Sequence, residues 1–365
     1  MSGQADRTDP DPSPDPGAEP VAVVLVTYQS AADLPSCLDA LPAAAGPHPL
    51  EVVVVDNASR DHSAEIARSR GLKVLEQPAN LGLSRAINLG AAQTAAPWLL
   101  VVNPDARLAA GSLAHMVATA TADERIGAVG PRLRNLDGSP YPTGRRFPSI
   151  LMGTLHAVLG TVWAANPATR RYHLADLERD APARVDWVSG ACMLLRRQAF
   201  DDVGGFDEGY FMYFEEIDLC LRLARGDWAV AYDPGAEVWH TVGGSTRSAP
   251  FRKVWNHHRS ALRFYCRRYR RDPRLALAPL VAAFLGLRGA SLLPEPPSPE
   301  PPAGPTPRDP SRSRRTRPGS SAGTNCSWLV VSWSSGHQRA SNRATRSMPR
   351  RAGGACSALS GSQTR

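Results

Sequence analysis

Between residues 21 and 102 the chain consists of short apolar runs separated by longer amphipathic segments. Valine-rich runs without a polar residue at every second position are typical of strands buried on both faces of a parallel sheet. Strands are predicted at Val21–Thr27, 51–56, 72–75 and Trp98–Val102, and helices at 31–41, 61–70 and 82–94. Strands that alternate with helices indicate an α/β fold with a doubly wound, mainly parallel central sheet.

Composition changes sharply at two places along the chain. Residues 1–20 contain five prolines and five acidic residues, and residues 294–310 contain nine prolines in seventeen positions. Such segments cannot bury enough apolar surface to offset the entropy of ordering. Disorder is therefore predicted for 1–20 and for the Pro/Ser/Arg-rich tail 294–365. No basic stretch followed by an apolar run begins the chain, so no signal peptide is predicted.

The net charge of +8 belongs to the C-terminal tail. Of the 42 basic and 34 acidic residues, eleven basic and three acidic ones lie in 294–365, which leaves 31 of each sign in 1–293. A neutral body argues against a dedicated nucleic-acid-binding protein, and the tail is predicted to be a solvated extension. No two of the six cysteines have the sequence spacing of a metal-binding knuckle or a redox motif. We therefore expect buried thiols in a reducing compartment such as the cytoplasm.

One apolar segment follows a basic stretch near the end of the body. Residues 275–287 are apolar or small throughout, and five arginines lie in 267–274. Thirteen residues are too few to span a bilayer. The pattern fits equally well a helix that lies on a membrane surface and a C-terminal helix that packs on the body.

Polar residues follow three of the predicted strands. Ligands of open α/β sheets bind at the carboxyl ends of the strands, where a carboxylate can accept a hydrogen bond from a base or a ribose. Ligand binding is therefore preferred over helix capping for Asp56. The candidates at the three strand ends are Thr27, Tyr28, Asp56, Asn57, Asn103 and Asp105.

A glycine beside an asparagine begins the third predicted helix. Gly82 would let the backbone approach a ligand, and Asn80 and Arg85 lie on either side of it. The sequence lacks G-x-G-x-x-G after the first strand, the P-loop G-x-x-x-x-G-K-[ST] and the nucleophile elbow G-x-S-x-G. Dinucleotide dehydrogenases, P-loop NTPases and α/β-hydrolases are therefore disfavoured.

Three carboxylates, those of Glu215, Glu216 and Asp218, lie within four positions after the aromatic run 211–214. Like charges this close repel, and aromatic surroundings disfavour the ionised forms, so the cluster suits a site that needs a proton acceptor. An acidic helix N-terminus is the alternative. If a helix begins at 215, Glu215 and Asp218 share a face and Glu216 points elsewhere, which does not identify the base.

Seven segments occur in order at the spacing of one protein family. They are VVLVTYQS (23–30), VVVDNASRD (53–61), NLGLSRAIN (80–88), LVVNPDA (100–106), DWVSGACMLLRR (186–197), GGFDEGYFMYFEEIDLCLRL (204–223) and WHTVGGST (239–246). Over about 21–247 the chain resembles the inverting glycosyltransferases of family 2, most closely bacterial rhamnosyltransferases that build cell-wall or surface polysaccharide on a lipid carrier. The resemblance implies one nucleotide-sugar-binding catalytic domain of the A type over 21–250, followed by a helical segment over 251–293.

The resemblance also implies a dTDP- or UDP-sugar donor at the strand ends. Thr27 and Tyr28 would line the base pocket, and Asp56 would bind the pyrimidine. The other donor-binding candidates are Asn57, Asn80, Arg85, Asn103, Trp187 and Gly190.

The segment Asn103-Pro104-Asp105 resembles the D-x-D metal motif of the family, with asparagine in place of the first aspartate. Asp105 would then be the main carboxylate ligand of Mg²⁺ or Mn²⁺, and Asn103 would act directly or through a bridging water. His240 resembles the late histidine that completes the metal site in some relatives, and imidazole suits Mn²⁺ better than Mg²⁺. A histidine packed beside Trp239 is the alternative.

Glu216 corresponds to the second of the paired acids in relatives and is the predicted base. Glu215 and Asp218 would orient the acceptor or set the basicity of Glu216. The implied acceptor is a lipid-linked or polysaccharide sugar, met in the cytoplasm or at the inner face of the plasma membrane. The sequence does not indicate the oligomeric state.

Three alternatives remain beside a transferase that uses dTDP-rhamnose. Transferases for UDP-galactofuranose or UDP-N-acetylhexosamine share these motifs. A nucleotidyltransferase usually has a Gly-rich basic loop after its first strand, where this chain has Thr27-Tyr28-Gln29-Ser30. A catalytically inactive nucleotide-sugar-binding protein is disfavoured because the acidic residues of the site are retained.

Overall fold

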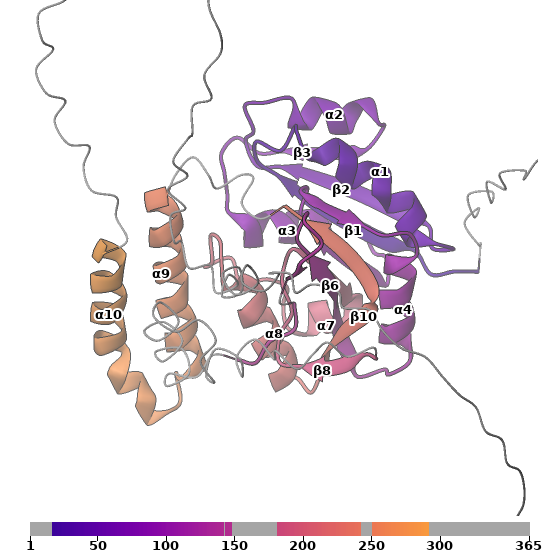
Figure 1. Cartoon of the computed structure of the whole chain (residues 1–365). Helices are drawn as coiled ribbons and strands as arrows, with labels where there is room; N and C mark the ends of the chain where they lie inside the picture. Colours follow the sequence, from indigo (N-terminus) through magenta and orange to yellow (C-terminus); the bar gives the residue numbers. More distant parts are fainter. Residues whose placement is uncertain (1–16, 142, 148–180, 242–249, 292–365) are drawn as a thin grey trace, which may run out of the picture.

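A mixed sheet forms the centre of the computed structural model, which describes residues 17–141, 143–147, 181–241 and 250–291 (Figure 1). Residues 1–16 and the tail 294–365, for which disorder is predicted, lie outside the described parts. Within these parts the sheet has ten strands, with β7 beside β6 and β8 beside β10 in addition to the main order β3-β2-β1-β4-β9-β6-β10-β5. The strands are β1 (Val21–Thr27), β2 (Leu50–Asp56), β3 (Lys73–Glu76), β4 (Trp98–Val102), β5 (Ala106–Leu108), β6 (Ile126–Arg134), β7 (Pro140–Tyr141), β8 (Ala183–Val185), β9 (Cys192–Arg196) and β10 (Ala229–His240).

Six of the ten strands in the described parts run in one direction. β3, β2, β1 and β4 pair in parallel, and β10 pairs in parallel with β6. Strand β9 is antiparallel to both β4 and β6 and therefore joins two groups of strands that point the same way. Among the described residues, strands β5, β7, β8 and β9 run against this direction. The predicted α/β fold with a mainly parallel sheet is confirmed.

Helices cover both faces of the sheet. They are α1 (Leu34–Ala45), α2 (Ser63–Ser69), α3 (Leu83–Ala91), α4 (Ser112–Thr121), α7 (Arg197–Asp202), α8 (Glu215–Arg225), α9 (Pro250–Arg268) and α10 (Ala278–Ser291), with a 3-10 helix η1 (Pro273–Leu277) before α10. Alternate residues of β1 point to opposite layers: Val23 packs into a core with α1 and α4, and Val24 into a core with α3 and α8. Both faces of β1 are therefore buried, which explains its continuous apolar sequence.

The predicted strand Val21–Thr27 matches β1 residue for residue, whereas the first predicted helix is displaced. The amides of Asp33 and Leu34 both donate to the carbonyl of Ser30, so a turn precedes α1. Pro35 then lies in the first helical turn, where its missing N–H costs nothing. The helix consequently begins at Leu34 and continues through Pro42 to Ala45.

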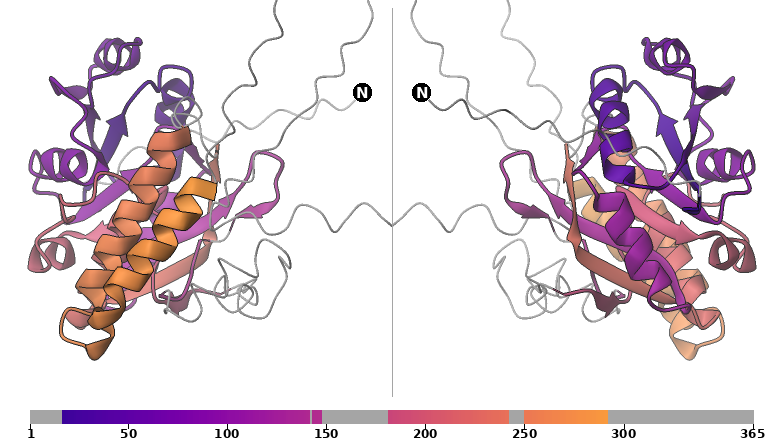
Figure 2. Two further views of the ribbon diagram at one scale, coloured as in Figure 1. Left: turned by 90° about the vertical axis from the view of Figure 1, so that its left-hand side faces the viewer. Right: turned by 90° about the vertical axis from the view of Figure 1, so that its right-hand side faces the viewer.

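The C-terminal helices α9 and α10 form an antiparallel hairpin at one side of the molecule (Figures 1 and 2). Helix α9 lies between α10 and α8, and its Phe264 enters the same core as α3 and α8. Among the described residues, no helix combines the length and apolar character that crossing a membrane requires.

Candidate active site

The carboxyl ends of β1 and β2 hold a buried carboxylate. The Oγ1 atom of Thr27 donates to Oδ1 of Asp56 at 2.8 Å, and the amide of Ser59 donates to Oδ2 at 3.0 Å. Thr27 and Asp56 pair directly across the parallel strands, and both are buried. Tyr28, the next residue of the chain, is 38% exposed. This sheet edge therefore combines a fixed acceptor with an accessible aromatic ring.

An asparagine pair connects the end of β2 to the loop before α3. Asn57 Nδ2 donates to Asn80 Oδ1 at 3.0 Å, and the amide of Leu81 donates to Asn57 Oδ1 at 2.8 Å. Both ends of the Asn57 amide are thus used within the protein, which supports a positioning role for it. The guanidinium of Arg85 is exposed at the start of α3, with its Nε 3.8 Å from Glu208 Oε2.

Gly82 allows the loop before α3 to touch the segment before α8. Its φ of 84° favours glycine, and a Cβ placed there would lie 2.7 Å from the carbonyl oxygen of Phe211. The amide of Leu83 also donates to that oxygen at 2.7 Å. The loop that contains Asn80 is therefore joined directly to the segment that leads into the acidic cluster.

Replacing Gly82 by alanine is expected to lower the free energy of unfolding by about 3 kcal/mol or more, because backbone strain and a backbone clash combine. Gly71 is the matched control: its φ is 72°, but a Cβ added to it would meet no atom within 4 Å. Gly71→Ala should cost about 1 kcal/mol. Urea unfolding followed by circular dichroism measures both, and equal losses would refute the role of the contact with Phe211.

The predicted metal-site residues meet at the ends of β4 and β10. His240 Nε2 lies 3.2 Å from Asp105 Oδ1 and 3.4 Å from Asn103 Nδ2. The antiparallel pairing of β10 with β5 aligns His240 with Ala106, and the amide of Thr241 donates to the carbonyl of Asp105 at 3.1 Å. The sheet register therefore brings this histidine beside the carboxylate.

The separation of Asp105 and His240 fits two ligands of one cation. Ligand atoms about 2.1 Å from a cation and at right angles to each other lie about 3 Å apart. Among the described residues, no group of three or more His, Cys, Asp or Glu side chains is placed to hold a metal. A cation held by Asp105 and His240 would need further oxygen ligands from water and substrate phosphate, which is how Mg²⁺ is commonly bound.

The paired glutamates lie in the first turn of α8. The two residues before them, Tyr213 and Phe214, have positive φ angles of 69° and 67°. Non-glycine residues rarely adopt this conformation, and it is concentrated at functional sites. One carboxylate oxygen in each of Glu215 and Glu216 is buried and has no hydrogen-bond partner among the described residues.

Burial sets the protonation of this pair. It raises the pKa of Glu215 well above the usual value for glutamate, and the charge of Glu216 raises it further. Burial also raises the pKa of Glu216, against the opposing effects of backbone hydrogen bonds and of the guanidinium of Arg145. The two neighbouring acids therefore hold protons at a pH where exposed glutamates are ionised.

The dipeptide Gly190-Ala191 connects the glutamates to the end of β4. A Cβ on Gly190 would lie 3.4 Å from the Cβ of Glu216, and the amide of Asn103 donates to the carbonyl of Ala191 at 2.9 Å. Asn103, whose side chain lies near His240, and Glu216 thus adjoin the same two residues directly before β9. This arrangement can combine cation binding with proton removal.

Comparison with known proteins shows the family. The family described as "Glycosyl transferase family 2" matches residues 22–222, more than half of the chain. The chain belongs to glycosyl transferase family 2. It is 39% identical over 260 residues to the N-acetylglucosaminyl-diphospho-decaprenol L-rhamnosyltransferase of Mycobacterium tuberculosis, over 68% of this chain and 84% of that protein.

Two further similarities were found. The Rhamnosyltransferase WbbL of Escherichia coli is 42% identical over 85 residues, which is 23% of this chain and 32% of that one. The mannosyltransferase PcManGT from Pyrobaculum calidifontis, solved in complex with GDP-Man and Mn²⁺, aligns with a TM-score of 0.48 and 19% identity over 76% of this chain and 73% of that one.

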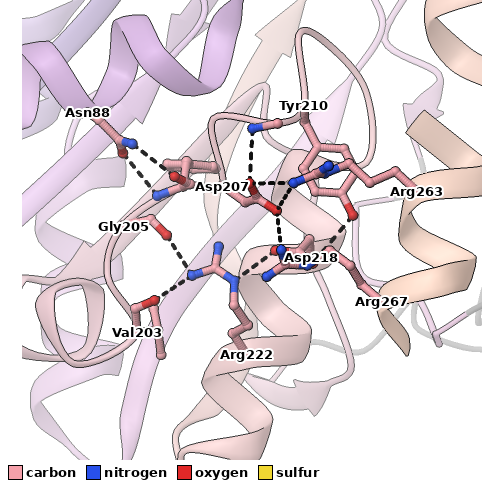
Figure 3. A network of polar contacts seen from close by, with 11 residues as sticks. Asn88, Val203, Gly205, Asp207, Tyr210, Asp218, Arg222, Arg263 and Arg267 are labelled. Carbon is pink, nitrogen blue, oxygen red and sulfur yellow. Dashed lines mark hydrogen bonds and ion pairs between the residues drawn. The ribbon is translucent and has the colours of Figure 1, made fainter. Parts of the chain in front are cut away.

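Asp218 of this glycosyltransferase is held by its own protein (Figure 3). Its Oδ2 lies 2.7 Å from Arg222 Nε, and its Oδ1 lies 3.2 Å from Arg267 Nε and accepts a hydrogen bond from the hydroxyl of Tyr210 at 3.4 Å. The side chain is 2% exposed. These contacts do not support the predicted role of Asp218 at the acceptor, and they hold α8 against α9 and the loop before α8.

Arg145 is the residue near the glutamates that sequence reasoning missed. It is 5% exposed, and its guanidinium lies 4.9 Å from the ring centroid of Trp187. Its backbone exchanges hydrogen bonds with that of Trp187, and the indole Nε1 of Trp187 donates to the carbonyl of Arg146 at 2.9 Å. Arg145 follows no recognisable motif, so only its position in the fold indicates its influence on Glu216.

Proposed function

We propose that this family 2 glycosyltransferase moves rhamnose from dTDP-rhamnose to a hydroxyl of a lipid-linked glycan acceptor, with inversion at the anomeric carbon and with Mg²⁺ or Mn²⁺ as cofactor. The observation that carries the proposal is that Asn103 and Glu216 adjoin the same dipeptide, Gly190-Ala191. A candidate cation pair and a candidate proton acceptor therefore lie near the same backbone segment.

The strand ends of β1 and β2 would bind the nucleotide. Asp56 is buried and fixed by two donors, so it presents an oriented acceptor toward a pyrimidine N–H. Tyr28 would stack on the base from the exposed side. The exposed guanidinium of Arg85 would exchange its distant contact with Glu208 for a diphosphate oxygen.

Asp105 and His240 would hold the divalent cation, with Asn103 bound directly or through water. The cation supplies positive charge that neutralises the departing diphosphate. The backbone of Thr241 holds Asp105 in place, and Tyr141 packs edge-on against the ring of His240 with 6.1 Å between the centroids. These contacts orient both side chains before the donor arrives.

Glu216 would remove the proton of the acceptor hydroxyl. That oxygen attacks the anomeric carbon from the face opposite the diphosphate, the bond from carbon to the phosphate oxygen breaks, and no covalent sugar–enzyme intermediate is needed. A raised pKa makes Glu216 a stronger base than an exposed glutamate once it is deprotonated. Glu215, whose pKa burial raises well above the usual value, would help to orient the acceptor, and Trp187 and Gly190 would lie beneath the sugar.

The relatives support the choice of donor and acceptor. Two of them are named rhamnosyltransferases, and the name of the Mycobacterium tuberculosis enzyme specifies an acceptor of N-acetylglucosamine linked through diphosphate to decaprenol. We extend that sugar and that class of acceptor to this chain. Assays of nucleoside diphosphate release distinguish a rhamnosyltransferase from transferases for UDP-galactofuranose or UDP-N-acetylhexosamine. They also distinguish it from a protein that binds nucleotide-sugars without catalysis.

A thermal-shift panel tests nucleotide and metal binding together. With Mn²⁺, dTDP at about a hundredfold excess over its Kd is expected to add about 2.7 kcal/mol of stability and to raise Tm by roughly 5 °C or more, because only the folded chain binds it. UDP should bind similarly or less tightly, and GDP should bind weakly. NAD should leave Tm unchanged with or without Mn²⁺.

The panel includes its own controls. Each nucleotide is also measured with EDTA, which should remove most of the shift if the diphosphate is bound through the cation. Stabilisation by NAD alone would refute the proposal. Release of nucleoside diphosphate from a panel of nucleotide-sugars, with and without a lipid-linked acceptor, then identifies the donor and separates transfer from binding.

A further inference from the structure

Helix α10 is apolar, but none of its side chains from 278 to 289 is buried. Apart from Arg288 and Ser291, its fourteen residues are apolar, glycine or proline. None of the side chains described from 273 to 289 is buried, and Leu280 and Leu287 are 67% and 75% exposed. A helix that is apolar all round is normally enclosed on every side. Its exposure here indicates that something other than the described chain covers it.

The exposed residues lie along one side of the hairpin. Leu280, Ala283 and Leu287 recur at helical spacing, so they form a continuous stripe. The opposite side of α10 faces α9, where Gly289 lies close to the imidazole of His258. Figures 1 and 2 show α10 as the outermost layer, with α9 between it and α8.

Positive charge is concentrated in the same hairpin. Residues 250–291 hold ten basic residues and one acidic residue, whereas residues 1–249 hold 21 basic and 30 acidic ones. The hairpin therefore carries a charge of +9 and the preceding chain −9. Arg270 and Arg271 are exposed at the corner between α9 and η1, and Leu275 and Leu277 of η1 are exposed as well.

We propose that this outer face, defined by Arg270, Arg271, Leu277, Leu280 and Leu287, binds an anionic lipid bilayer. The leucines would enter the boundary between head groups and acyl chains, and the two arginines would pair with lipid phosphates. A second copy of this chain is disfavoured as the occupant because two hairpins of +9 repel each other. The tail 294–365 is disfavoured because it carries +8 itself.

The hairpin is attached directly to the acidic cluster. Ser260 of α9 donates to the carbonyl of Met212 at 2.9 Å, and Arg267 pairs with both Asp207 and Asp218 (Figure 3). A bilayer bound to α10 would therefore hold α8 and its glutamates at a set distance from the membrane. This consequence for the acceptor rests on the proposed function, whereas the lipid contact itself does not.

Sedimentation of the full-length protein with vesicles tests the lipid contact. Vesicles of phosphatidylcholine alone are compared with vesicles that contain about one third phosphatidylglycerol, and binding is expected only to the anionic ones. Leu280→Ser with Leu287→Ser, and separately Arg270→Ala with Arg271→Ala, should each weaken binding roughly tenfold or more. The basic tail is present in every variant, so differences between variants report on the hairpin.

Matched controls lie elsewhere on the surface. Leu136→Ser removes a leucine that is 61% exposed near the turn between β6 and β7, and Arg60→Ala with Arg125→Ala removes two exposed arginines. These variants should bind like the wild type. Equal binding of the hairpin variants and the wild type would overturn the proposal, as would equal binding to neutral vesicles. A concentration-dependent dimer that is lost in Leu280→Ser with Leu287→Ser, without vesicle binding, would also overturn it. The vesicle assay measures lipid binding and no turnover. A negative result would therefore overturn the lipid contact and leave the proposed function untouched.

Discussion

Replacing Glu216 by glutamine is expected to lower kcat about a thousandfold while the nucleotide-sugar still binds. General base catalysis typically contributes a factor of about 10² to 10⁴, and the amide cannot accept the proton of the acceptor hydroxyl. The substitution keeps the volume of the side chain, so its contact with Gly190 is preserved. Steady-state kinetics with saturating donor measure kcat, and calorimetry with dTDP and Mn²⁺ measures binding. A rate near that of the wild type would remove the assignment.

The neighbouring acid and the pH profile provide the controls. The base must be deprotonated, and burial raises the pKa of Glu216, so kcat/KM should rise with pH through a midpoint above the usual value for glutamate. Burial raises the pKa of Glu215 well above the usual value, so Glu215→Gln replaces one neutral group by another and should leave this midpoint near its wild-type position while activity remains. Glu124→Gln, on the exposed surface, should change neither. If Glu215→Gln is the inactive variant instead, the base is Glu215.

Replacing Asp105 by asparagine is expected to lower kcat by about 10² to 10³ and to raise the Mn²⁺ concentration that gives half-maximal rate. The change removes the negative ligand beside His240 and retains the shape of the side chain. Less charge then opposes the negative charge that develops on the departing diphosphate, an effect worth several kcal/mol at such sites. Initial rates measured across a Mn²⁺ titration give both quantities.

His240→Ala tests the second predicted ligand of the cation, and Glu124→Gln is the surface control. The histidine variant should lose affinity for Mn²⁺ more than for Mg²⁺, because imidazole suits the first ion better. Glu124→Gln should titrate like the wild type. If Asp105→Asn leaves the Mn²⁺ concentration for half-maximal rate unchanged, the cation is bound elsewhere.

The strained turn before α8 shows how the fold supports the acid pair. Tyr213 and Phe214 adopt positive φ angles, and each such residue costs on the order of 1 kcal/mol or more. Phe214 packs against Phe264 and His257 of α9, with ring centroids 5.7 and 5.3 Å away. Burial lowers the pKa of His257 to about 3, so this histidine is neutral at physiological pH. Apolar packing by α9 therefore holds a conformation that local sequence disfavours.

The sheet edge could be predicted from the sequence to a large extent. Strands buried on both faces appear as unbroken apolar runs, so the predicted bounds of β1 and β4 match residue for residue. The carboxyl ends of parallel strands share one edge, and this rule alone predicts that Asp56, at the end of β2, and Asp105, after β4, lie at the same edge of the sheet. The helix starts were less accurate, because caps and turns such as the one at Ser30 depend on individual hydrogen bonds.

The functional grouping of the acids could not be derived in the same way. Asp218 lies three positions from Glu215 and has the same chemistry, yet Arg222 and Arg267 occupy its two oxygens. Arg267 belongs to α9, and no local pattern connects it to α8. The sequence alone predicted an acidic cluster. The packing of α9 shows that Asp218 holds the helix in place, whereas Glu215 and Glu216 each keep one carboxylate oxygen without a partner among the described residues.

The sequence by itself determined where the buried strands lie and which polar residues follow them. A strand that is buried on both faces has apolar residues at consecutive positions, so its burial can be recognised from its own sequence. Only the tertiary structure decided how His240 is brought to Asp105 and that Gly190 faces Glu216. The first contact depends on the antiparallel pairing of β10 with β5, and the second on how α8 packs beside the start of β9. Contacts between distant segments follow from sheet register and helix packing, which are set by the whole chain and leave no periodic pattern in either segment.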